Sequence, residues 1–336
     1  MTFPISYLIF FFTLLLGTMI SISSPSWFGA WVGLELNMMS FIPLISFKMN
    51  SYFSEAALKY FLIQALSSSL FIASSFMFIS FMFISSTFIF LALLLKLASA
   101  PFHFWFPQVM EGLNWPQILI LSTIQKLAPM ILLSYLLTNT ILIKMTLISA
   151  ILSAIMGALG GLNTMKLRKI IAFSSINHMS WMIMAISAGD TFWMFYFLIY
   201  SLILFSITSS FFKMQAFTLS DLMQSDQTST SNALMLSFSI LSLGGLPPFT
   251  GFIPKWILIQ IMVNLNLFIP LFFLLISALI TLYFYIRIVV IFILLSNPIM
   301  NFNMKHKSPN SFKFSIPMKM TFNFVGLFLP FYFIFI

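Results

Sequence analysis

SSTFIFLALLLKLASAPFHFWFPQV, residues 85–109, is an apolar run that contains one lysine (Lys96), one histidine (His103) and two prolines. A helix that spans a bilayer needs about 20 mostly apolar residues, so this run is long enough to cross a membrane. Proline inside a helix removes a backbone hydrogen bond and kinks the helix. We therefore expect a membrane crossing that is broken near Pro101.

The composition of the whole chain agrees with lipid as its solvent. Of the 336 residues, 61% are hydrophobic and only 6% are charged, whereas a soluble domain carries about 25% charged residues. The absence of cysteine excludes disulfides and cysteine-ligated iron–sulfur clusters. The net charge of +9 is interpreted as a sign of membrane topology, and no nucleic-acid partner is expected.

Eleven apolar runs predict an all-α polytopic membrane protein with about 11 transmembrane helices. The expected helices cover residues 3–21, 25–46, 56–82, 85–109, 117–137, 142–160, 169–188, 191–212, 233–262, 266–296 and 318–336.

Charge placement favours eleven crossings, because alternate loops then fall on the same side. The amino-terminal side holds nine basic residues: Lys48, Lys166, Arg168, Lys169, Lys213, Lys305, Lys307, Lys313 and Lys319. The other side holds Lys144 near its loops. Basic residues collect on the side that is not translocated, so we expect the amino terminus inside and the carboxyl terminus outside.

A second break is expected in residues 244–256, GGLPPFTGFIPKW, where prolines again lie beside a lysine, Lys255. Prolines at helix ends are the alternative interpretation. Broken helices at membrane depth are typical of transport sites. The breaks fall on expected helices 4 and 9, and an offset of five helices gives opposite orientations. This pattern predicts one domain, residues 1–336, with two inverted five-helix repeats (1–137 and 142–296) and a final helix (318–336).

Four charged residues are expected at membrane depth: Glu35, Lys96, Lys126 and Lys255. A charge at the bilayer centre costs roughly 2.5–3.5 kcal/mol on insertion scales, so such residues are functional candidates. Lys96 needs a partner from another helix, and Glu35 is the obvious one. A purely structural carboxylate at Glu35 and a Lys255 that extends to the interface are the alternatives.

His103 and His178 are candidates for auxiliary proton relay, since histidine titrates near neutral pH. A hydrogen-bonded structural role is an equal alternative for each. Arg287 is expected to extend to the membrane interface. Together, the buried lysines and Glu35 suggest a proton path in which a change of charge at one site drives a proton from the next.

Four motifs closely resemble the subunit 2 family of mitochondrial NADH:ubiquinone oxidoreductase (respiratory complex I), in an insect-like version. They are KLASAPFHFW (96–105), STIQKLAP (122–129), RKIIAFSSINHMSW (168–181) and LGGLPPFTGFIPKW (243–256). The resemblance extends over essentially the whole chain and implies the antiporter-like fold of that family.

The resemblance implies a proton-pumping module of the mitochondrial inner membrane, with the amino terminus in the matrix and the carboxyl terminus in the intermembrane space. It implies relay roles for Glu35, Lys96, Lys126 and Lys255, and auxiliary roles for the two histidines. It implies no cofactor in this chain, because NADH, FMN, iron–sulfur clusters and ubiquinone are bound by other subunits. Its partners would be lipids, a neighbouring antiporter-like subunit and small core membrane subunits.

Two other functions stay open at this point. A subunit of a cation/proton antiporter would work without redox partners. A purely structural membrane scaffold would need the buried charges for assembly only.

Overall fold

The structure is a computed structural model that describes residues 5–46, 51–78, 80–137, 139–224 and 230–295. This part of the chain forms fourteen α-helices and one isolated antiparallel bridge, between Lys166 and Thr218. The helices are α1 (Ile5–Ser23), α2 (Trp27–Ser46), α3 (Ser51–Met77), α4 (Met82–Leu97), α5 (Trp105–Gly112), α6 (Trp115–Ser122), α7 (Ile124–Leu136), α8 (Thr140–Gly161), α9 (Leu167–Ala188), α10 (Asp190–Met214), α11 (Leu219–Gln224), α12 (Thr230–Gly244), α13 (Phe252–Asn264) and α14 (Phe268–Leu295).

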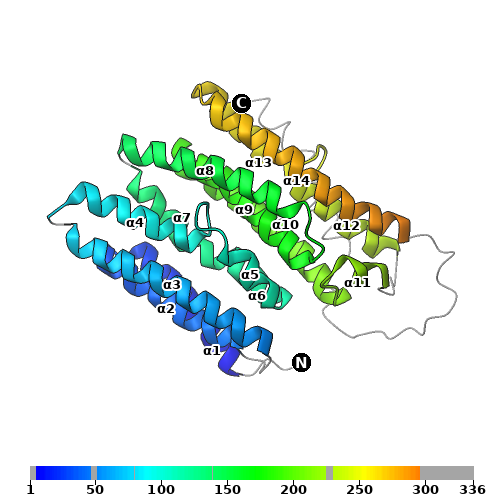
Figure 1. The fold of residues 1–336 in the computed structure, drawn as a ribbon, viewed down its shortest axis with the longest axis horizontal. Helices are drawn as coiled ribbons and strands as arrows, with labels where there is room; N and C mark the ends of the chain where they lie inside the picture. Colours follow the sequence, from blue (N-terminus) through cyan, green and yellow to red (C-terminus); the bar gives the residue numbers. More distant parts are fainter. Residues whose placement is uncertain (1–4, 47–50, 79, 138, 225–229, 296–336) are drawn as a thin grey trace. The chain divides into compact units, whose positions relative to one another are not determined.

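The helices form two compact units, residues 1–156 and 157–336, which divide within α8. In the first unit, α2 packs against α1 and α3 (Figure 1). The helix α7 packs against α1 and α4. In the second unit, α10 packs against α9, α12 and α13, and α14 packs against α9 and α12.

Ten of the expected helical segments have counterparts in the structure, and two of them are broken as expected. The run 85–109 becomes α4 and α5, and the run 233–262 becomes α12 and α13. A third break, at Thr123 between α6 and α7, was not expected. The last expected helix, 318–336, lies outside the described residues.

Eight described segments are long and apolar enough to cross a membrane. They are Ile5–Ser23, Trp27–Ser46, Ser51–Met77, Trp115–Leu136, Thr140–Gly161, Leu167–Ala188, Asp190–Met214 and Phe268–Ile291. Three shorter apolar helices, Met82–Leu97, Leu234–Gly244 and Phe252–Asn264, adjoin the two expected breaks. The structure is therefore that of an all-α membrane protein, and the count of eleven crossings stays a prediction.

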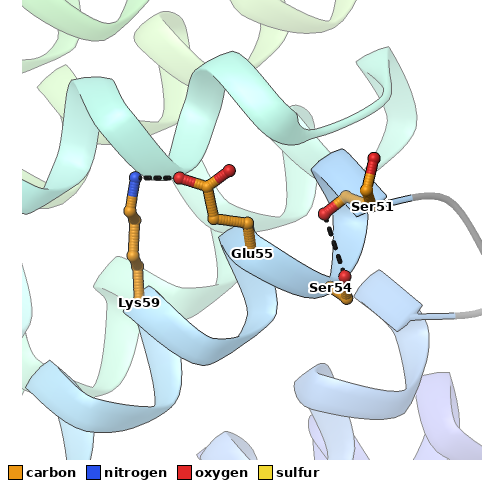
Figure 2. Close-up of polar contacts among 4 residues, drawn as sticks. All are labelled: Ser51, Ser54, Glu55 and Lys59. Atoms are coloured by element: carbon orange, nitrogen blue, oxygen red, sulfur yellow. Dashed lines mark hydrogen bonds and ion pairs between the residues drawn. The ribbon is translucent and has the colours of Figure 1, made fainter.

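The first turns of α3 carry an exposed ion pair, Lys59 Nζ to Glu55 Oε1 at 2.6 Å, one helical turn apart (Figure 2). Because α3 has 27 residues and a crossing needs only about 20, these turns can extend beyond the hydrocarbon. The pair is what a water-facing helix end would carry, in contrast to the buried lysines described below.

Glycines allow two helix pairs to approach closely, in the same way in each unit. A Cβ on Gly17 of α1 would lie 2.9 Å from the backbone N of Asn37 in α2. A Cβ on Gly157 of α8 would lie 2.7 Å from the backbone N of Asn177 in α9. Only glycine permits these backbone approaches, so the first two helices of each unit pack by a shared device.

Candidate functional site

The break after α4 leaves Lys96 in the last turn of that helix, buried with 7% of its surface exposed. Ala98 adopts a left-handed conformation (φ 55°), and Pro101 follows it. The carbonyls freed by the break find other donors: Ser99 N–H donates to Leu94 O at 3.2 Å, and Trp105 Nε1 donates to Leu95 O at 3.1 Å. These bonds satisfy the freed carbonyls without using the lysine.

Lys126 lies in the first turn of α7, directly after the unexpected break at Thr123. The hydroxyls of Ser122 and Thr123 donate back to the carbonyls of Ile118 and Leu119, at 2.7 and 2.6 Å. Such bonds compete with regular helix geometry. Lys126 is 2% exposed, and its Nζ has no hydrogen-bond partner among the described residues.

One small cavity in the first unit brings Lys96 and Lys126 together. Its volume is about 10 Å³, at the lower limit of what one water molecule needs. Asn37, Tyr60, Gln64, Gln125 and Trp105 also line it. The Lys126 Nζ lies 4.6 Å from the ring centroid of Phe106, where a cation is attracted to the aromatic face.

Three residues that line this cavity are joined by hydrogen bonds that the sequence did not reveal. Gln125 Nε2 donates to Asn37 Oδ1 at 2.8 Å, and Tyr60 Oη donates to Gln125 Oε1 at 3.2 Å. These hydrogen bonds join α2, α3 and α7, and they fix the side chain of Gln125, the residue next to Lys126. Their only signal in the sequence is the presence of polar side chains in apolar runs.

Glu35 lies in the middle of α2 and is half-buried. Its Oε2 is buried and lacks a hydrogen-bond partner within the described residues. The carboxylate lies within electrostatic range of Lys96 and Tyr60, but it makes no direct ion pair with Lys96 in the described part of the chain. The two charges can therefore influence each other without being locked together.

His103 lies in the segment between α4 and α5, where it is 4% exposed and packs against Phe104. Its ring lies near the Pro101 carbonyl, and its Nδ1 makes no hydrogen bond to any described residue. His103 is thus adjacent to the break, but it is not among the residues that line the lysine cavity.

In the second unit, Lys255 lies in the first turn of α13 and is 7% exposed. Its Nζ donates to the carbonyl of Gly244, the last residue of α12, at 2.7 Å. A helix carboxyl terminus carries partial negative charge, which favours a cation there. Gly245 has φ 78°, a conformation that L side chains rarely adopt, and a Cβ there would lie 2.9 Å from that Nζ, so the lysine would have to shift. Lys255 therefore bridges the break itself.

His178 lies on α9 and is buried, with Nδ1 2.9 Å from the Oη of Tyr196 on α10. Both residues line a second small cavity, together with Tyr200, Ser242 and Pro254. Pro254 precedes Lys255 in α13, so the histidine and this lysine belong to neighbouring parts of the second unit.

Arg287 on α14, expected at the interface, donates from Nη1 and Nη2 to the carbonyls of Leu162 and Thr164, at 3.0 and 2.6 Å. These carbonyls follow directly after α8, so the guanidinium joins α14 to the end of α8. This arrangement supports a structural role.

Among the described residues, no three histidines, cysteines or carboxylates gather in a group that could hold a metal ion. The chemistry that the site offers is proton transfer, since buried amines, an imidazole and a carboxylate line or adjoin two water-sized cavities.

A profile of the family described as NADH:quinone oxidoreductase/Mrp antiporter, transmembrane, matches residues 24–281. The chain belongs to this family. Within the NADH:quinone oxidoreductase/Mrp antiporter family, "NADH-ubiquinone oxidoreductase chain 2" of Anopheles gambiae is 47% identical over 296 residues, which cover 84% of this chain and 85% of the relative.

Solved structures support the fold of this family member. A chain of respiratory complex I from Thermus thermophilus with bound aureothin matches with a TM-score of 0.78 and 22% identity, over 96% of this chain and 76% of that one. A chain of the Mrp complex from Dietzia sp. matches with a TM-score of 0.74 and 15% identity, over 83% of this chain and 59% of that one. At these identities the likeness concerns the fold alone.

Proposed function

We propose that this chain is a core membrane-arm subunit of respiratory complex I that moves protons from the matrix to the intermembrane space. The observation that carries the proposal is Lys126, a buried amine with no hydrogen-bond partner in the described part of the chain, on a cavity that it shares with Lys96. The chain 2 relatives support the same function. NADH oxidation and ubiquinone reduction take place on other subunits.

In the first unit, Glu35 and Lys96 are the two charges that respond to the neighbouring subunit, and they interact at a distance without a direct ion pair. A change in charge at Glu35 alters the field at Lys96, because the two interact across a low-dielectric interior. Lys126 is the central relay, and Lys96 and Lys126 exchange protons through water in their shared cavity. His103 serves as an auxiliary relay beside the break.

In the second unit, Lys255 passes the proton toward the exit or the next subunit, with His178 as auxiliary relay. The hydrogen bond from Lys255 to Gly244 O supports this role, because it ties the charge of the lysine to the broken backbone. A proton that leaves Lys255 would turn a charged donor into a neutral one and weaken the hydrogen bond to that carbonyl.

The proposed architecture is one antiporter-like domain with eleven crossings, two inverted five-helix repeats and a terminal helix. The shared helix packing at Gly17 and Gly157 supports a repeat. The asparagines that these two glycines approach also support a repeat. Asn37 accepts a hydrogen bond from Gln125 of α7, and Asn177 Nδ2 donates one to Ser277 O of α14. In this architecture the amino terminus lies in the matrix and the carboxyl terminus in the intermembrane space.

The proposed partners are a neighbouring antiporter-like subunit, small core membrane subunits and lipids. The chain itself binds no cofactor in this proposal. FMN, iron–sulfur clusters, NADH and ubiquinone belong to the other subunits, and the redox chemistry is theirs.

A subunit of a cation/proton antiporter is the second candidate function, and the similar fold of a chain in the Mrp complex favours it. Purification of the native complex separates the two. We expect FMN and iron–sulfur clusters to co-purify with this chain, together with NADH:ubiquinone reductase activity. A purified complex that contains this chain, exchanges cations for protons and lacks flavin and iron–sulfur signals would contradict the proposal.

A further inference from the structure

The hydrogen bond between His178 Nδ1 and Tyr196 Oη leads beyond the roles proposed above. Both side chains are buried, they come from adjacent helices α9 and α10, and both line the second cavity. The ring of Tyr200 lies 5.0 Å from the imidazole, so aromatic packing also fixes the plane of the histidine. A neutral imidazole carries its proton on one ring nitrogen, and the hydrogen bond that it makes decides which one.

We propose that Tyr196 is a positioning residue that accepts a hydrogen bond from His178 Nδ1–H and leaves Nε2 as the nitrogen that takes up and releases the relayed proton. The inference rests on the proposed relay role of His178. On uptake, one proton binds Nε2 and neutral His178 becomes an imidazolium; on release, the same proton leaves Nε2. The tyrosine oxygen gains and loses no proton.

The hydrogen bond also changes strength during this cycle. When His178 is an imidazolium, the Nδ1–H···Oη bond has a charged donor, and such bonds are roughly twice as strong as neutral ones. Tyr196 thus stabilises the protonated form more than the neutral form. A hydroxyl that instead donated to Nδ1 would stabilise the neutral form, so the two arrangements have opposite consequences.

Other titratable side chains surround the pair. Tyr200 lies on α10, Tyr285 of α14 lies beside Tyr196 and Tyr200, and Lys255 lies on α13 next to a residue of the cavity wall. The Tyr285 hydroxyl is buried and lies near the Ser174 side chain, and it makes no hydrogen bond to His178 or Tyr196. Tyr285→Phe is therefore a matched control for Tyr196→Phe.

The test measures NADH-driven proton pumping against pH, with the complete complex in sealed lipid vesicles. The alkaline limb of the profile is the fall in pumping rate at high pH. In Tyr196→Phe we expect this limb to move about half to one pH unit toward lower pH, because one charge-assisted hydrogen bond is lost. Tyr285→Phe should leave the limb unchanged. In a His178→Ala background, Tyr196→Phe should have no further effect, because it acts through the histidine.

Any of three results with the tyrosine variants would overturn the inference. They are a limb that stays in place or moves toward higher pH in Tyr196→Phe, an equal shift in Tyr285→Phe, and an undiminished effect of Tyr196→Phe without His178. A His178→Ala complex that pumps like the wild type at every pH also overturns the inference. The proposed lysine relay is tested separately, by the Lys126→Met variant.

Discussion

At the scale of single residues, three lysines are held in the protein interior by three different arrangements. Lys255 donates to a carbonyl at a helix break, Lys96 lies within electrostatic range of Glu35, and Lys126 contacts an aromatic ring and has no hydrogen-bond partner among the described residues. A lysine at bilayer depth costs roughly 2.5–3.5 kcal/mol. Lys126 has the weakest compensation of the three, so we expect its protonation to respond most readily to a change of charge nearby.

The first prediction compares a buried with an exposed lysine. Lys96→Met should lower the rate of NADH-driven proton pumping by about tenfold or more, since positioned proton-transfer groups contribute on that scale. Lys59→Met should leave pumping near the wild-type rate, because an exposed ion pair such as Lys59–Glu55 contributes about 0–1 kcal/mol. Quenching of a pH-sensitive dye in vesicles measures both. Equal losses in the two variants would show that burial of the lysine is irrelevant.

The six candidate site residues were proposed from the sequence, because a charge or a histidine in an apolar run is conspicuous. Their partners are not visible. The bonds of Asn37 with Gln125 and of His178 with Tyr196 join different helices, and a single sequence carries no record of which helix faces which. The expected direct pairing of Glu35 with Lys96 depended on distance, which spacing along the chain cannot give.

At the scale of helices, the positions of breaks were predictable where proline marks them. The break at Thr123 was not, because the nearest proline, Pro129, lies inside α7. The available signal was the Ser122-Thr123 pair, whose hydroxyls bond to the preceding turn. Such pairs also occur in unbroken helices, so this signal alone would not have placed the break.

The second prediction concerns the contact between α1 and α2. A Cβ on Gly33 would lie 2.8 Å from the carbonyl oxygen of Gly17 and 2.7 Å from the Cα of Ser21, and backbone atoms cannot move aside cheaply. Gly33→Ala should therefore destabilise the chain by about 1–3 kcal/mol. Leu36→Ala, at an exposed position of the same helix, is the control. The midpoint of thermal inactivation of the complex should fall in the first variant only; an unchanged midpoint would contradict the close packing.

The third prediction concerns Asp221 of α11, which lies outside the apolar spans. Slight burial raises the pKa of its carboxyl, but hydrogen bonds from the Phe217 N–H and from Thr218 lower the pKa more, so that it lies below its ordinary value near 3.9. Because the folded-state pKa is depressed, the stabilisation is present above the unfolded-state pKa and is lost as pH falls through the folded-state value.

Asp221→Asn should accordingly speed hydrogen exchange at the Phe217 and Thr218 amides severalfold at pH 7. The difference from the wild type should disappear at a pH below the folded-state pKa, where the native carboxyl is itself protonated. Exchange read by mass spectrometry on the purified complex measures both. Equal exchange rates in Asp221→Asn and the wild type at pH 7 would mean that the carboxylate does not protect the Phe217 and Thr218 amides.

At the scale of the whole molecule, the two units share features that alternation of polar and apolar residues could not reveal. The close approach at Gly17 and Gly157, and the asparagine bonds to α7 and α14, occur at corresponding places of each unit. The offset of the two proline breaks suggested a repeat from sequence, whereas the helix pairs that support it became visible only in three dimensions. The units differ at their lysines: a cavity holds two in the first, and a helix break binds one in the second.

The most direct test is the rate of NADH-driven proton translocation, together with the number of protons translocated per NADH oxidised, in vesicles that contain the complex with Lys126→Met. We expect the rate of NADH-driven translocation to fall at least about tenfold, because the central relay can no longer take up or release a proton. The redox cofactors should still be reduced by NADH, since they belong to other subunits. Full proton-to-electron stoichiometry at the full rate would contradict a relay through Lys126.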